Sequence, residues 1–427
     1  MHAQKYIRLL FILFLVRIAV SLSFSDGKLR SDSLNYFGLS LNLIEHFTFT
    51  AVTPADEEAL RGGVTVTEFF EHYDRQPSPY RRLMNYQWLH SLLFIPIILL
   101  FKSLYAIIVV NNLLFFGAGY FLFDIVKDKV PLIDLLMGWI IFLFFPPFFY
   151  LTNQFYSEPL FLFFLAVIIH SIVLKKRAGA IVILSLILLP VTRGFGLLFI
   201  AGCIAMLVWE KEFRSAAIYA LCGFAALGMN QIVGANTRDP ETITLWSPPP
   251  VIYSVYFTNT VYGNGDNDLF LTYPEKLLED SAFVAYLREE YSSLDLMEDL
   301  VAQNFRNPSA SAVTLTNRLG AYFLNVVPDS WNYEQRPNQS TLRRILWSLQ
   351  NGGVILLLLL GLKKCDSRYR RYFSMLFWIS FAAHLIALSR YRYFQPVLIA
   401  GIPAVTAGVE RLRELLLRGT KKYAPPH

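Results

Sequence analysis

The chain has 427 residues, of which 55% are hydrophobic, 15% aromatic and only 16% charged. This balance excludes an ordinary soluble globular protein and predicts a polytopic membrane protein. The formal net charge of +6 is carried by short basic clusters between apolar runs. Such clusters are typical of loops at a membrane face and argue against a nucleic-acid surface.

The first apolar segment begins at Tyr6 and ends at Phe24, and no Ala-x-Ala cleavage site follows it. We therefore expect a retained first span and not a cleaved signal peptide. A membrane span needs roughly 20 apolar residues. On this criterion the predicted spans are about 6–24, 104–126, 132–149, 157–174, 178–192, 194–209, 213–234, 344–362, 372–389 and 394–410.

The stretch 87–101 is a candidate eleventh span, and the charge of the loops decides its interpretation. If it does not cross, the basic loops near 127–129, 175–177, 210–214 and 363–371 all fall on one side, together with both termini. If it crosses, these loops fall on opposite faces. Because Lys and Arg in short loops set orientation, we expect about ten spans with both termini inside. The stretch 87–101 would then lie at the outer interface.

This topology predicts an all-α polytopic fold in three parts. Residues 1–234 would form a core of about seven spans, with surface helices in the first extracytoplasmic loop, 25–103. Residues 235–343 would form a second extracytoplasmic segment, and 344–427 would hold the last spans and a basic cytoplasmic tail. No internal repeat is visible, so nothing indicates the inverted halves of many secondary transporters.

A carboxylate follows the first span. Asp32 opens an amphipathic run that ends near Phe49 and is typical of a helix lying on a membrane surface. Asp32 is either an N-cap, stabilised by the dipole of that helix, or a general base at the membrane edge. Both alternatives place a carboxylate at the outer surface.

Two further charged residues lie at the outer ends of apolar segments. Glu158 opens one span, where a carboxylate either pairs with the helix dipole or faces a cavity. Both alternatives stay open, and Glu158 is a second catalytic candidate beside Asp32. Arg193 occupies a short outer turn, where the charge rule does not favour an arginine. We interpret Arg193 as a substrate-binding residue.

Other outer arginines are candidate ligands for a phosphate. Arg75 lies in the first loop, and Arg390 and Arg392 flank Tyr391 just before the last span, with no acidic residue near them in sequence. A guanidinium presents paired donors to phosphate oxygens, and a tyrosine hydroxyl adds one more. Simple contacts with lipid headgroups are the alternative.

No motif indicates a cofactor. The seven histidines show no HExxH or comparable ligand spacing, and no Walker or GxGxxG motif is present. Asn264 to Asp268 resembles part of a calcium loop, but Leu269 stands at the glycine position, so a turn is favoured. The three cysteines form no CxxC pair. We therefore expect neither a metal site nor a cofactor.

Several short segments together resemble the membrane glycosyltransferases of the GT-C class, which include the protein mannosyltransferases and the bacterial aminoarabinose transferases. These segments are 32–36 after the first span, 75–80, 157–161, 192–194 and 390–396. Their order and their shared outer position carry the resemblance. It covers most of the first 235 residues and the 389–410 region.

The resemblance implies a sugar donor carried on a polyprenyl phosphate and transfer to an acceptor on the extracytoplasmic face. It implies that Asp32 activates the acceptor, and that Arg390 or Arg392 holds the phosphate leaving group. Tyr36, in the matched first segment, is expected to contact the substrate. Arginines would supply the positive charge that stabilises the departing phosphate, a role that a metal ion fills in other enzymes. We expect a multi-pass protein of the bacterial inner membrane, in contact with its lipids.

Other classes of protein remain as alternatives. A transporter or lipid flippase predicts ionisable residues deep within spans and broken helices near the midplane. Arg17 in the first span is its main candidate, unless the side chain snorkels to the surface. A polysaccharide polymerase or an assembly protein for lipid-linked glycans would share the outer arginines.

Overall fold

A computed structural model of the chain describes residues 2–30, 32–47, 63–72, 88–175, 179–237, 341–386 and 391–422, with the single residues 302, 308 and 323. Helices dominate this described part. Its strands, β1 (Lys28–Leu29) and β2 (Val64–Thr65), form a two-residue antiparallel ribbon. The predicted all-α class is confirmed for these residues.

Among the described residues, three helices are long and apolar enough to cross a membrane: α1 (His2–Ser23), α6 (Leu104–Asp124) and α12 (Phe213–Thr237). A fourth span results if α7 (Leu132–Phe144) and α8 (Pro146–Thr152) count as one helix bent by 54°. These helices support the prediction of an integral membrane protein. The prediction of about ten spans is not confirmed.

The remaining apolar helices of the described part are shorter. They are α5 (Trp88–Phe101), α9 (Glu158–Val173), α10 (Ala180–Thr192), α11 (Phe195–Trp209) and residues 348–362 of α19 (Thr341–Leu362). α5 has 14 residues and contains Pro96. At 1.5 Å per residue it is roughly 21 Å long, less than the roughly 30 Å of a hydrocarbon core. Its length therefore favours the predicted interfacial position over a crossing.

The chain divides into two compact units. The first comprises Met1–Arg238, Ile355–Leu376 and Leu398–His427, and the second comprises Asp239–Val354 and Phe377–Val397. The predicted division into three parts is based on which segments lie on each side of the membrane. The two compact units do not test that division. All the contacts of the candidate site described below lie within the first unit.

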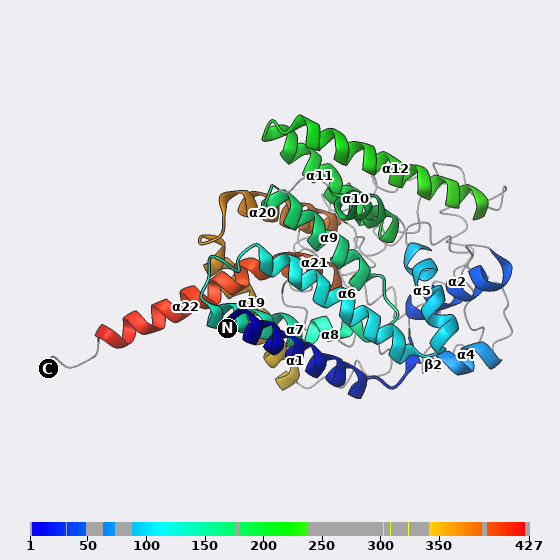
Figure 1. Ribbon diagram of the computed structural model, residues 1–427, viewed down its shortest axis with the longest axis horizontal. Helices are drawn as coiled ribbons and strands as arrows, with labels where there is room; N and C mark the ends of the chain where they lie inside the picture. Colours follow the sequence, from blue (N-terminus) through cyan, green and yellow to red (C-terminus); the bar gives the residue numbers. More distant parts are fainter. Residues whose placement is uncertain are drawn as a thin grey trace. The chain divides into compact units, whose positions relative to one another are not determined.

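The interior of the first unit is built on α6 and α9, which pack closely against each other. α10, α11 and α12 pack together beside α9, and α22 (Ile402–Lys422) packs on α7 (Figure 1). Stacked aromatic rings join α6 to α7. Phe115 stacks on Phe142 and Phe123 stacks on Trp139, each pair with centroids 4.2 Å apart. Apolar and aromatic packing therefore fixes the helices that carry the charged residues described below.

The segment after the first span folds onto α5. α2 (Asp32–His46) is the predicted amphipathic helix, and its buried residues Phe37 and Leu41 join Phe94 and Ile98 of α5 in one apolar cluster. The strand ribbon and α4 (Val66–His72) contribute to the same cluster. Figure 1 shows α2, α4, α5 and β2 gathered at one end of the unit.

The second unit is described only in part. Its described helical residues belong to α19 up to Val354, to α20 (Ser367–Ile386) from Phe377, and to α21 (Tyr391–Ala400) up to Val397. The ring of Phe323 packs against those of Phe377, Phe381 and Phe394, at centroid distances of 6.3, 5.8 and 5.6 Å. The calcium-like turn at 264–268 lies outside the described residues.

Candidate functional site

Three of the predicted site residues come together in the first unit. Tyr36 lies on α2, Glu158 opens α9, and Arg193 caps the end of α10. The Nη1 atom of Arg193 lies 2.6 Å from Oε1 of Glu158, and the Tyr36 hydroxyl lies 3.3 Å from Oγ of Ser157. We call Tyr36, Ser157, Glu158 and Arg193 the Glu158 cluster.

Ser157 links the two contacts because its hydroxyl does not cap its own helix. It stands at the N-cap of α9, where a serine oxygen commonly accepts a hydrogen bond from a backbone N–H of the first turn, yet it makes no such bond. Instead its Oγ atom accepts a hydrogen bond from Nη1 of Arg193 at 3.4 Å and contacts the Tyr36 hydroxyl. The cluster is therefore continuous from α2 to α10.

The turn after α10 explains how Arg193 reaches α9. Arg193 leaves the helix with an extended backbone (φ −152°, ψ 129°), and its N–H still donates to the carbonyl of Leu189. α11 then starts at once. A Cβ added at Gly196 would lie 2.8 Å from backbone atoms of Leu189 and Pro190, so only glycine permits this close return. The tight turn holds Arg193 at the helix end.

The Glu158 cluster is buried. Tyr36 is 1% exposed, Ser157 0% and Glu158 3%, and the side chain of Arg193 is 11% exposed. Moving charges out of water is costly, so a buried carboxylate and a buried guanidinium each depend on the other for compensation. Glu158 also lies in the first turn of α9, where the helix dipole favours a negative charge.

Gln154, just before the cluster, ties four segments together. Its side-chain oxygen accepts a hydrogen bond from Ser33 of α2 at 3.0 Å, and its Nε2 atom donates to the carbonyl of Lys28 in β1 at 3.2 Å. Its backbone carbonyl accepts a bond from Asn111 of α6 at 2.8 Å. The start of α9 is thus fixed relative to the start of α2.

A histidine is enclosed beside Tyr36. His90 of α5 is fully buried, with ring centroids of Phe94 and Phe155 at 4.5 Å and that of Tyr36 at 5.6 Å. Within the described residues neither of its ring nitrogens has a hydrogen-bond partner. Burial of this kind favours the neutral imidazole.

The other predicted site residues are described less fully. Asp32 is the first residue of α2, one helical turn before Tyr36, so its backbone lies at the same end of the unit as the Glu158 cluster. Its side chain is outside the described part. Arg75 and Arg390 lie outside the described residues. Tyr391 and Arg392 open α21, and their side chains are likewise outside. The predicted convergence of Asp32 with Arg390 and Arg392 therefore stays a prediction.

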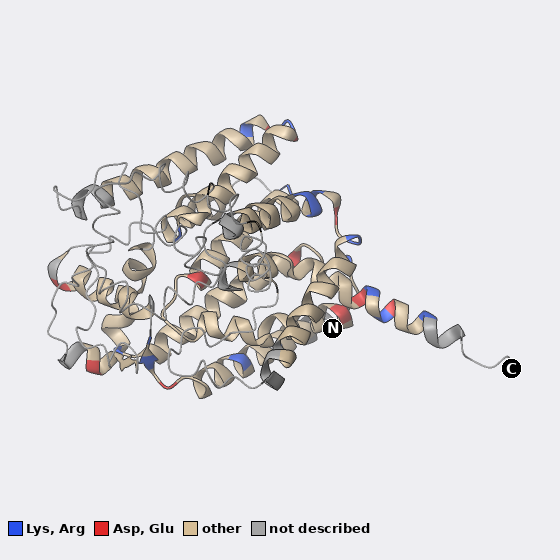
Figure 2. Cartoon of the chain, turned by 180° about the vertical axis from the view of Figure 1, so that it is seen from behind, with Lys and Arg blue, Asp and Glu red and all other residues tan. Residues whose placement is uncertain are grey.

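Acidic and basic residues meet at the other end of α9 in what we call the basic-end cluster, Glu210, Glu212, Arg368 and Arg371. Arg368 donates to Glu212 at 2.8 and 3.0 Å and pairs with Glu210 at 3.1 Å, and Arg371 pairs with Glu210 at 2.5 Å. Figure 2 shows charged residues on the α11–α12 turn, at the start of α20 and on the part of α22 nearer the C-terminus. The loops near 210–214 and 363–371, which the charge pattern predicts on one side, thus contact each other.

The two ends of α9 each carry a charged contact. Glu158 in the first turn meets Arg193, and His170 in the last turn lies 2.7 Å from Asp124 at the end of α6. Asp124 also pairs with Lys127 at 2.6 Å. A helix of 16 residues, roughly 24 Å long, separates these groups. They therefore belong to opposite ends of the unit.

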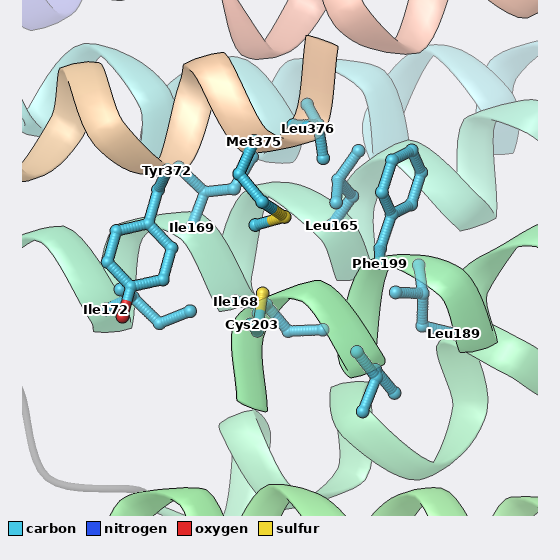
Figure 3. A pocket seen from close by; sticks show the side chains of 11 residues that line it. Leu165, Ile168, Ile169, Ile172, Leu189, Phe199, Cys203, Tyr372, Met375 and Leu376 are labelled. Atoms are coloured by element: carbon cyan, nitrogen blue, oxygen red, sulfur yellow. The ribbon is translucent and has the colours of Figure 1, made fainter. Parts of the chain in front are cut away.

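Two of the cavities among the described residues of the first unit are lined by residues outside the Glu158 cluster. The first lies between α9, α11 and α20 (Figure 3), where Ile168, Cys203, Tyr372 and Met375 are among the lining residues. Its free volume is about 10 Å³, room for no more than one water molecule. This cavity is too small for a substrate.

The second cavity is larger, at about 170 Å³, and lies at the basic end between Lys129, Lys364, Cys365 and Glu410. Lys364 is already paired with Glu410, at 3.1 Å. Burial raises the pKa of the Cys365 thiol to about 12, so the thiol stays protonated and is not a nucleophile at neutral pH.

Within the described ranges, no group of three or more His, Cys, Asp or Glu side chains has the geometry of a metal site. Comparison with protein-family models and with curated proteins gave no match. The site therefore has to be argued from its own residues.

Two members of the site were missed by sequence reasoning. The motif at 157–161 was noticed, but not the role of the Ser157 hydroxyl, and nothing in the sequence marks Gln154. A serine directly before an acidic first turn reads as an ordinary helix cap. Only the structure shows that it is used elsewhere.

Proposed function

We propose that this chain is an integral-membrane glycosyltransferase that moves a sugar from a polyprenyl phosphate to an acceptor. One observation supports this most. Polar side chains from three separate helices converge at one end of the helical unit, and one of these helices begins with Asp32. Polar groups gathered in an otherwise apolar setting are costly and commonly mark function.

In this proposal the chemistry is one displacement at the anomeric carbon. The acceptor oxygen forms a bond to that carbon while the bond to the phosphate oxygen breaks, and the electron pair leaves with the polyprenyl phosphate. Asp32 takes the acceptor proton as general base. Arginines stabilise the negative charge that develops on the departing phosphate. A single displacement inverts the anomeric configuration.

The geometry refines the roles of Glu158 and Arg193 within this proposal. Glu158 is buried and paired with Arg193 at 2.6 Å, so we assign it the orientation of that guanidinium and not a proton transfer. Arg193 keeps donors that Glu158 does not use. The phosphate would be held mainly by Arg75, Arg390 and Arg392. Arg390 and Arg392 have no acidic residue within two positions in sequence, whereas Asp74 directly precedes Arg75.

Asp32→Asn tests the proposed base. The variant would be reconstituted in vesicles with undecaprenyl phosphate carrying radiolabelled mannose, glucose or aminoarabinose and an envelope extract as acceptor. We expect transfer to fall by more than about 100-fold. The matched control is Asp26→Asn, since Asp26 lies in the same loop, is about half exposed and pairs with Arg30. Normal transfer by the Asp32 variant would remove Asp32 from the mechanism.

The proposal places the Glu158 cluster on the outer face of a bacterial inner membrane. It is supported by the excess of Lys and Arg in the loops at 175–177 and 363–371, the second of which contributes Arg368 and Arg371 to the basic-end cluster. A membrane-impermeant maleimide applied to intact cells should label a cysteine introduced at Asp26 and not one introduced at Arg371. The reverse labelling pattern would invert the orientation.

A transporter or flippase is the second candidate, and two observations favour it. Arg17 is fully buried and does not snorkel, and α7 and α8 form a broken helix. Both features are typical of transport pathways. A flippase would move a fluorescent polyprenyl phosphate across vesicle membranes without consuming a sugar donor. Flipping without transfer would therefore replace the first proposal with the second.

A further inference from the structure

Arg17 is a buried cation whose partners are unusual. It lies in α1 at 0% exposure, and none of its hydrogen-bond partners in the described part of the chain is a carboxylate. Nε donates to Oδ1 of Asn112 at 2.7 Å. The guanidinium carbon lies over the rings of Phe115 and Phe149, at 4.5 and 4.4 Å from their centroids. The side chain is thus fixed on both faces and at its edge.

The two Nη atoms bind the break between α7 and α8. Nη1 donates to the backbone carbonyl of Leu143, in the last turn of α7. Nη2 donates to the carbonyl of Phe148 at 3.1 Å and to the hydroxyl of Thr152 at 3.0 Å, both in α8. One side chain therefore bonds to both halves of the bent helix.

The sequence explains why a donor is needed there. In a continuous α-helix the carbonyl of Leu143 would accept from the N–H four residues later, which is that of residue 147. Residue 147 is proline, which has no N–H, and Pro146 before it breaks the helix in the same way. A carbonyl left without a donor in an apolar interior is strongly destabilising. Arg17 supplies the hydrogen bond that Pro147 cannot.

The bend leads directly to the Glu158 cluster. α8 ends at Thr152, Gln154 follows and bonds to Ser33, and Ser157 and Glu158 begin α9. Six residues, 153–158, lead from the end of α8 to the first residue of α9. Any rotation of α8 about the break would therefore move the start of α9 relative to α2.

We propose that Arg17 is a positioning residue for the candidate site: it locks the bend between α7 and α8 and so holds the segment from Gln154 to Glu158 against α2. This proposal adds Arg17 to the residues of the site. It rests on the proposed function only in the kinetic experiment, which measures sugar transfer. Its structural consequence is independent of the reaction.

The experiment compares Arg17→Lys with the wild type in lipid nanodiscs by amide hydrogen exchange. Lysine keeps the charge but cannot reach the separate acceptors with a planar fork. We expect exchange in residues 141–158 to rise about tenfold or more, while residues 205–216 at the basic end stay unchanged. Arg368→Lys is the matched control and should leave 141–158 unaffected.

A milder variant keeps the test decisive if Arg17→Lys does not fold. Thr152→Val removes one acceptor of Arg17 with little change of shape, and we expect a smaller rise confined to the same segment. Unchanged exchange in 141–158, or a rise spread over all helices, would overturn the proposal.

A kinetic readout completes the test where a donor is turned over. A positioning residue should lower kcat with little change in KM for the undecaprenyl-phosphate sugar, because binding groups stay in place while the reacting groups shift. A pure rise in KM would contradict positioning. If the wild type transfers no sugar, the proposed function fails, and the exchange data alone decide the role of Arg17.

Discussion

The two ends of α9 hold charged residues in contrasting surroundings. At the first turn, Glu158 and Arg193 have side chains only 4% and 11% exposed. At the opposite end, Arg371 and Lys127 are about half exposed while they pair with Glu210 and Asp124. The opposite end is thus mixed, because Arg368 and Glu210 in its interior are only 7% and 10% exposed while their outer partners are reached by water.

This difference separates what each end does. Exposed ion pairs contribute about 0–1 kcal/mol, since water screens them, so the pairs made by the exposed Arg371 and Lys127 say more about orientation in the membrane than about stability. A buried pair is different. Well-packed apolar residues would often stabilise the fold equally well in its place. The presence of the Glu158 pair is therefore better explained by function than by stability, and this explanation is open to test.

The largest effect is expected from Glu158→Gln. The change leaves the Arg193 guanidinium buried without its carboxylate, so the free energy of unfolding should fall by about 3–5 kcal/mol. The measurement is reversible unfolding in mixed micelles with increasing SDS. The control Asp26→Asn, which breaks the more exposed pair with Arg30, should cost no more than about 1 kcal/mol.

The double variant Glu158→Leu, Arg193→Met sharpens this comparison. Removing both charges should restore the free energy of unfolding to within about 1–2 kcal/mol of the wild-type value. Sugar transfer should nevertheless be lost, because the proposed site then lacks Glu158 and Arg193. A double variant as unstable as Glu158→Gln alone would show that the pair is needed for folding, and the functional explanation would lose its support.

A smaller effect is expected from Tyr36→Phe. Loss of one buried hydroxyl contact, at 3.3 Å from Ser157, should cost about 0.5–1.5 kcal/mol of stability. Tyr150→Phe is the matched control, because it removes a comparable hydroxyl contact with Tyr156, at 2.8 Å, outside the Glu158 cluster. Transfer should fall about tenfold more in the Tyr36 variant than in the control. Equal losses would remove Tyr36 from the site.

Sequence reasoning could find residues that break a simple rule, and their roles in the site stay a prediction. Glu158 and Arg193 were singled out because charges at the ends of apolar segments are costly, and the structure pairs them at 2.6 Å. Asp32 was expected at the start of a helix, and α2 begins there. The helical class followed from apolar runs, which composition and periodicity reveal well.

What could not be predicted depends on distance in sequence. Arg17 was noticed as a buried cation, but its partners Leu143, Phe148 and Thr152 lie more than 120 residues away. Two adjacent prolines interrupt the span predicted at 132–149, and no local pattern shows which side chain repairs the break. The number of spans also failed to follow from apolar runs. α9, α10 and α11 match the predicted runs closely, but they have only 16, 13 and 15 residues, fewer than the roughly 20 that a membrane span needs.

The smallest effect is expected at the basic end, from acid. Hydrogen bonds from Arg368 hold the pKa of Glu212 below its ordinary value. A carboxylate whose pKa is lowered in the folded state stabilises the protein above the unfolded pKa, and that contribution is lost as the pH falls through the folded pKa. The Glu212 side chain is about a third exposed, so the contribution should stay under about 1 kcal/mol.

Glu212→Gln measures this contribution directly. At pH 7 the variant should melt slightly below the wild type, and the gap should close as the pH falls from about 5 to about 3, because the wild-type carboxylate is then protonated as well. High salt should also narrow the gap, as expected for a pair that water reaches. A gap that persists at about pH 3 and in high salt would show that the Glu212 pair is as well shielded from water as the Glu158 pair, and the contrast between these two pairs would disappear.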